Sequence, residues 1–170
     1  MHSIHLKLTL AGGLLITLAT LGAAQAYGDS SKPSSKPETF SAMLSGAHEV
    51  PAVNSLGTGM AKFVVKNDST ITYDITLKGV PGVTAAHIHL GAAGASGAPV
   101  ATLTKGAAPG EKITGTILPK DLHGATMSQL IAAMKSGGAY VNVHTKTHPD
   151  GEVRGQIQAG ASAMMSRLTH

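Results

Sequence analysis

The 170-residue sequence contains no cysteine and no tryptophan, and aromatic residues make up only 3% of it. The absence of cysteine excludes disulfide bonds, thiolate metal sites and cysteine nucleophiles. The scarcity of aromatic side chains removes the platforms on which single-stranded nucleic acids stack. Lys and Arg number 13 against 9 Asp and Glu, but they are scattered and form no Arg-rich run. We therefore expect no nucleic-acid partner.

The sequence also shows no apolar run of membrane-spanning length near its start. The apolar stretch Leu8–Leu21 has about 14 residues, whereas a spanning helix needs roughly 20. Lys7 precedes this stretch, and Ala24-Gln25-Ala26 follows it with the small-x-small pattern of a cleavage site. These features predict a signal peptide over residues 1–26, cleaved after Ala26. We therefore expect a secreted or periplasmic protein without stable membrane insertion.

Composition divides the rest of the chain into three parts. Residues 27–38, with the sequence YGDSSKPSSKPE, are rich in Ser and Pro and are expected to form a flexible linker. Residues 39–158 carry the periodic segments and form the predicted domain. Residues 159–170 show no clear period and are predicted to be a flexible C-terminal tail.

Within the domain, several short segments alternate apolar and polar residues with a period of two, which is typical of half-buried β-strands. Turns rich in Gly, Pro, Asn and Asp separate them. The predicted strands cover residues 39–44, 59–66, 70–77, 83–90, 99–104, 112–118, 139–145 and 152–158. This pattern predicts an all-β fold, an antiparallel Greek-key β-sandwich or barrel of about eight strands.

One stretch of the domain has helical rather than strand periodicity. Leu130, Ala133 and Met134 recur at helical spacing, Thr126 or Ser128 is suited to cap the start, and glycines follow at 137 and 138. A short inserted helix is therefore predicted over about residues 127–135.

Strand parity brings histidines onto one face. Residues two apart on a strand share a face, so His87 and His89 point the same way, opposite to the apolar Ala86 and Ile88. The same rule places His144 on the polar side of the strand over 139–145. If these strands are neighbours, the three histidines share an outward polar face. The supporting residues predicted for this face are His48, Glu49, Asn142, Glu152 and Arg154.

Two interpretations of this polar face are open. Three converging neutral imidazoles are suited to bind copper or zinc, with acidic neighbours orienting the rings. The other interpretation is a hydrogen-bonded polar surface, or a contact surface for a protein partner in which the loop Gly91–Pro99 takes part. The sequence offers no serine in a G-x-S-x-G turn, and we assign no catalytic residue and expect no enzyme.

Three segments together are similar to the CHRD domain, a family named after the animal protein chordin and found in bacterial exported proteins. They are FSAMLSGAHEVPAVNSLGTGMAKFVV, ITYDITLKGVPGVTAAHIHLGAAGASGAPVATL and SGGAYVNVHTKTHPDGEVRGQI. His48 stands where the family is expected to have Asn or Gln. The resemblance implies an exported stand-alone module for which no catalytic residues are established.

The order of motifs also resembles that of copper–zinc superoxide dismutase, whose fold is a Greek-key β-sandwich. By this resemblance His87 and His89 match the His-x-His copper ligands, and His144 matches a late copper ligand. The bridging histidine, the zinc ligands and the disulfide have no clear counterparts. We therefore expect a non-enzymatic binding or structural module of the cell envelope or extracellular space. The alternative is a copper- or zinc-binding protein for storage, resistance or dismutase-like redox chemistry.

Overall fold

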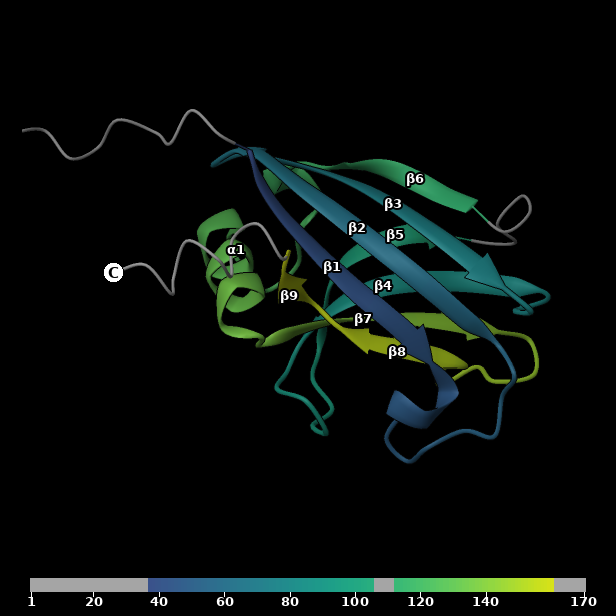
Figure 1. Ribbon diagram of the computed structural model, residues 1–170. Helices are drawn as coiled ribbons and strands as arrows, with labels where there is room; N and C mark the ends of the chain where they lie inside the picture. The colour runs from purple at the N-terminus through teal and green to yellow at the C-terminus, as the bar shows by residue number, and fades with distance from the viewer. Residues whose placement is uncertain (1–36, 106–111, 161–170) are drawn as a thin grey trace, which may run out of the picture. The chain divides into compact units, whose positions relative to one another are not determined.

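β-strands dominate the described part of the computed structural model, residues 37–105 and 112–160, which belong to one compact unit (Figure 1). The strands are β1 (Glu38–Ser45), β2 (Thr58–Asn67), β3 (Thr70–Lys78), β4 (Val83–Leu90), β5 (Pro99–Lys105), β6 (Lys112–Ile117), β7 (Ala139–Thr145), β8 (Val153–Gln156) and β9 (Gln158–Ala159). The 3-10 turns η1 (Gly46–His48) and η2 (Pro119–Asp121) and the helix α1 (Met127–Ser136) complete the elements. The predicted signal peptide, most of the linker and the tail beyond residue 160 lie outside the described residues.

The predicted strands are confirmed, and β4 and β7 have the predicted bounds. The segment expected as one strand over 152–158 is instead divided into β8 and β9 at Ile157. Ile157, between them, is fully buried in the core, and its N–H donates to the Ala139 carbonyl on β7, one step beyond the pair Tyr140 and Gln156. β9 then pairs with β1, so strand pairing extends one residue beyond the expected domain at each end, to Glu38 and Ala159.

The strands form one antiparallel, nearly closed barrel-like sheet, as predicted. Their order is β5-β4-β7-β8-β1-β2-β3-β6, with β9 beside β1. β5 and β6 stand at the two ends of this order, and a side chain of β3, the strand beside β6, reaches across to β5. The hydroxyl of Tyr73 on β3 donates to the Leu103 carbonyl on β5 at 2.7 Å. Gly115 on β6 leaves the space for this reach, because a Cβ there would lie 2.3 Å from the Tyr73 hydroxyl oxygen.

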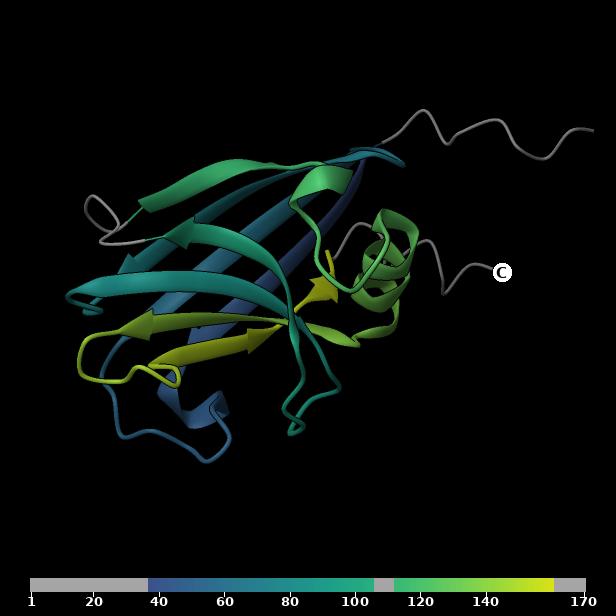
Figure 2. The same cartoon turned by 180° about the vertical axis from the view of Figure 1, so that it is seen from behind.

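The apolar residues fill the inside of this sheet, and α1 lies at one end of it (Figure 2). Met127, Leu130, Ile131 and Met134 form the buried face of the helix. Thr126 caps its start in a capping box with Gln129, and Gly137, at φ 73°, ends it in the left-handed region. Among the described residues, no helix has both the length and the apolar character needed to cross a membrane.

Candidate metal centre

β4 and β7 are hydrogen-bonded neighbours, which is the pairing that the predicted histidine cluster needs. His87 stands opposite Asn142, His89 opposite Tyr140, and His144 opposite Ala85. The alternate residues of β4, Ala86 and Ile88, are fully buried in the core. The three histidines therefore lie together on the side of the sheet away from the core, as strand parity predicts.

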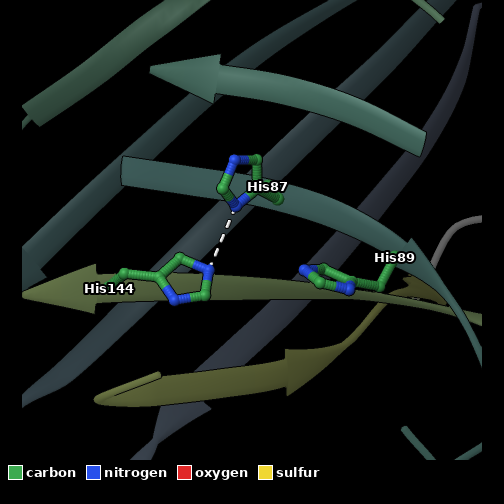
Figure 3. A group of neighbouring side chains, drawn as sticks. All are labelled: His87, His89 and His144. Atoms are coloured by element: carbon green, nitrogen blue, oxygen red, sulfur yellow. Dashed lines mark hydrogen bonds between the residues drawn. The ribbon is translucent and has the colours of Figure 1, made fainter. Parts of the chain in front are cut away.

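The three imidazoles form a compact group. One ring nitrogen of each histidine lies within 4.8 Å of those of the other two. His87 Nδ1 is 3.0 Å from His144 Nε2, and the ring centroids of these two residues are 5.0 Å apart. Figure 3 shows His87 and His89 on one strand and His144 on the next, with the His89 ring extending toward His144. Three imidazole nitrogens from two adjacent strands are thus gathered at one place on the sheet.

Backbone carbonyls fix which nitrogen of two rings carries hydrogen. His89 Nδ1 lies 2.8 Å from the Gly97 carbonyl oxygen, and His144 Nδ1 lies 2.9 Å from that of Pro149. A carbonyl oxygen only accepts, so both Nδ1 atoms are the donors and both Nε2 atoms carry lone pairs. His89 Nε2 is buried without a hydrogen-bond partner among the described residues. A ligating histidine that donates its other N–H to a carbonyl has this arrangement.

The loop between β4 and β5 brings the Gly97 carbonyl to His89. Residue 97 has to be glycine, because a Cβ there would lie 1.6 Å from the Leu90 carbonyl oxygen. Side chains from the sheet hold the loop: the Tyr140 hydroxyl accepts from Gly97 N–H, and Arg154 donates to the Ala95 carbonyl at 2.7 Å. The tautomer of His89 therefore depends on the docking of this loop.

A stack of three side chains continues from the cluster. The rings of His89 and Tyr140 are parallel to within 12°, with centroids 4.9 Å apart. The Arg154 guanidinium carbon lies 3.4 Å from the Tyr140 ring centroid, a cation–π contact. Burial, followed by the neighbouring His144 and His89, lowers the pKa of His87. Burial also lowers the pKa of His89, as do His144 and Arg154, while the Gly97 carbonyl opposes this. Both rings therefore favour the neutral form that binds metals.

The polar face is covered rather than exposed, which corrects the expectation that it points outward. Tyr140, Asn142, Glu152 and Arg154 are only 2%, 6%, 7% and 3% exposed. The loops after β1, β4 and β7 contribute its hydrogen-bonding partners, such as Ser55, Ala95 and Asp150. Parity assigned these side chains to the correct side of the sheet, but the packing of loops over that side is not visible in strand periodicity.

The predicted supporting residues hold the loops that cover the polar face. None of them belongs to the histidine group itself. Glu152 accepts from the hydroxyls of Ser55 at 2.9 Å and Thr145 at 2.6 Å, which joins two loops to β7. The amide of Asn142 lies 3.5 Å from Glu49 Oε2, a long contact.

The other two supporting residues, His48 and Glu49, lie in and directly after η1. Exposed His48 places its Nδ1 3.2 Å from the Arg154 carbonyl oxygen. Burial raises the pKa of Glu49 to about 7, and Arg154 opposes the increase.

Sequence reasoning missed the residues that orient the rings. These are Gly97 and Pro149, which act through their backbone carbonyls. Backbone acceptors have no side-chain signature. A usable signal was present, however: both acceptors lie in Gly- and Pro-rich loops that directly follow the histidine strands.

Comparison with known families identifies the chain. A family model for the CHRD domain matches residues 40–157, which is more than half of the chain. The protein therefore belongs to the CHRD family, as the three sequence segments suggested. A search of curated proteins found no match.

Proposed function

We propose that this CHRD-family protein is a non-enzymatic metal-binding module that holds one copper or zinc ion between His87, His89 and His144. The observation that carries the proposal is the lone pair of His89 Nε2, which is buried and has no hydrogen-bond partner among the described residues. A buried polar atom without a partner costs about 1–3 kcal/mol. A metal ion bound at this nitrogen would remove that cost.

The chemistry of the donors supports the proposal. Neutral imidazole nitrogen is a standard ligand for both copper and zinc. His89 and His144 each donate their Nδ1–H to a carbonyl, which leaves Nε2 directed at the group. In the absence of metal, the 3.0 Å contact between His87 Nδ1 and His144 Nε2 is a hydrogen bond with a single hydrogen. A metal ion bound there would take the place of that hydrogen, and His87 would remain neutral by carrying its hydrogen on Nε2 instead.

The predicted signal peptide over residues 1–26 supports a location in the periplasm or outside the cell. An exported chain without disulfides gains stability from a bound ion by mass action. A protein partner in the envelope or extracellular space is compatible with this role. The loop Gly91–Pro99, which extends from β4 next to the histidines, is the surface we expect such a partner to contact.

The test is elemental analysis of the purified chain after loading with Cu²⁺ or Zn²⁺ and desalting. We expect about one metal ion per chain in the parent and in His123→Ala, whose histidine is exposed and outside the group. We expect none in the double variant His87→Ala/His89→Ala, with the fold retained by circular dichroism. Equal retention in all three proteins would place the metal elsewhere. No retention in the parent would refute a tight site.

A further inference from the structure

The charge around the three histidines distinguishes between the metal ions that they are able to bind. Within the described residues the group contains histidines alone, so it supplies no carboxylate. The atoms that orient His89 and His144 are also neutral, because they are the carbonyls of Gly97 and Pro149. The donor set therefore contributes no negative charge to balance that of the ion.

The nearest charged neighbour along the stack is a cation. Arg154 lies against the face of Tyr140, whose ring is parallel to that of His89. Arg154 is 3% exposed and makes no ion pair among the described residues. Its positive charge is thus poorly shielded by water, and it adds to the cost of any positive charge placed at His89.

The two buried carboxylates of this face lie outside the histidine group. Glu152 accepts from Ser55 and Thr145, and Glu49 faces the amide of Asn142. Neither belongs to the histidine group. The cost of desolvating an ion rises with the square of its charge, so a monovalent ion is far less penalised here than a divalent one.

The number of donors is compatible with both metals. The described residues supply three nitrogens. Zn²⁺ is commonly held by three histidines with water as the fourth ligand, whereas Cu⁺ needs no fourth ligand. The preference for Cu⁺ therefore rests on charge.

Resting on the proposed function, we infer that the ion held by His87, His89 and His144 is Cu⁺, and that the site discriminates against Cu²⁺ and Zn²⁺ by charge. The neutral donors and the nearby Arg154 cation penalise a divalent ion more than a monovalent one. The protein then binds copper in its reduced state and stabilises that state against oxidation.

The experiment measures the three affinities separately on the full chain. Cu⁺ is supplied anaerobically with ascorbate, and each metal is competed against a chromophoric chelator of known affinity. We expect Cu⁺ to bind at least ~100-fold more tightly than Cu²⁺, which raises the copper potential by ~120 mV relative to a site without preference, since tenfold is about 59 mV for one electron. We expect Zn²⁺ to bind at least as weakly as Cu²⁺.

A charge variant tests the reason for the preference. Ala85 is half-buried, stands opposite His144 and lies on the same face as His87. Ala85→Asp should narrow the ratio of Cu⁺ to Zn²⁺ affinity at least ~10-fold, because a carboxylate within reach of the ion favours the dication. Ala85→Asn has nearly the same shape without the charge and should leave the ratio unchanged.

Each outcome has a separate meaning. Binding of Zn²⁺ or Cu²⁺ more tightly than Cu⁺ through the same histidines would overturn the inference and leave the proposed function intact. An equal change in Ala85→Asp and Ala85→Asn would overturn the charge argument. If none of the three ions binds to the parent chain, both the inference and the proposed function are wrong.

Discussion

Glu49 is expected to lower the stability of the protein at alkaline pH. Its side chain is 8% exposed, and its Oε1 has no hydrogen-bond partner among the described residues; the same holds for Asn142 Oδ1. Both atoms lie close to Gly151, because a Cβ there would be 2.8 Å from the first and 2.6 Å from the second. A proton on Glu49 Oε1 would supply the missing donor for both. Glu49→Gln supplies N–H donors at every pH with nearly the same shape.

The size and sign of the effect follow from the pKa of Glu49, which burial raises from 4.5 to about 7. Below pH 4.5 the carboxyl is protonated in both the folded and the unfolded chain, and it carries no penalty. Between the two values the unfolded chain releases the proton and the folded chain keeps it, so stability falls as pH rises. Above pH 7 the full penalty is present, at about 1.4 kcal/mol for each pKa unit, or about 3 kcal/mol in total.

The assay is urea unfolding of the parent and Glu49→Gln between pH 4 and pH 8.5. Relative to the parent, Glu49→Gln should have nearly the same free energy of unfolding near pH 4.5 and a value about 2–3 kcal/mol higher at pH 8. Glu38→Gln is the control, because Glu38 forms an exposed ion pair with Lys135 and its removal should change stability little. A Glu49→Gln variant that is less stable than the parent at pH 8 would refute the reasoning. It would show that Glu49 is ionised and stabilised by Arg154.

Three further substitutions test the fold by urea unfolding at neutral pH. Tyr73→Phe removes the bond to the Leu103 carbonyl and should cost about 1 kcal/mol; an unchanged midpoint would mean that this link between β3 and β5 contributes nothing. Leu130→Ala empties a fully buried position of α1 and should cost about 2–5 kcal/mol, and a loss below 1 kcal/mol would contradict the packing of the helix onto the core. Thr126→Ala removes the cap that accepts from Gln129 N–H and should cost about 1 kcal/mol, whereas Ser128→Ala should cost less, and equal losses would argue against Thr126 as the cap.

The parts of the fold that could be predicted are those with a local signal. The bounds of β4 and β7 follow from alternation between turn residues, and the helix follows from its 3.6-residue period with Thr126 before it and Gly137 after it. The order of strands has no local signal, since β4 and β7 are neighbours although two strands and a helix separate them along the chain. That the three histidines come together could therefore be predicted only on the condition that β4 and β7 are neighbours.

The surroundings of the site were harder to predict than its ligands. Parity places Asn142 and Arg154 on the correct side, but it predicts exposure where the structure has burial. The cover comes from loops, and the contacts that hold them are between side chains and backbone carbonyls, as with Arg154 and Ala95. Such contacts depend on the path of the loop rather than on its residue types, so sequence periodicity carries no information about them.

The register between β4 and β7 determines both the packing of the core and the placement of the histidines. On both strands, residues that fill the core alternate with residues that face the histidine group, as with Ile88 between His87 and His89. A one-residue slip of either strand would send the imidazoles inward and the apolar residues outward. Folding and ligand placement are thus encoded in the same register. All three imidazoles belong to one two-stranded ladder, so the unit to transplant into another antiparallel sheet is that ladder with the two loops whose Gly97 and Pro149 carbonyls orient the rings.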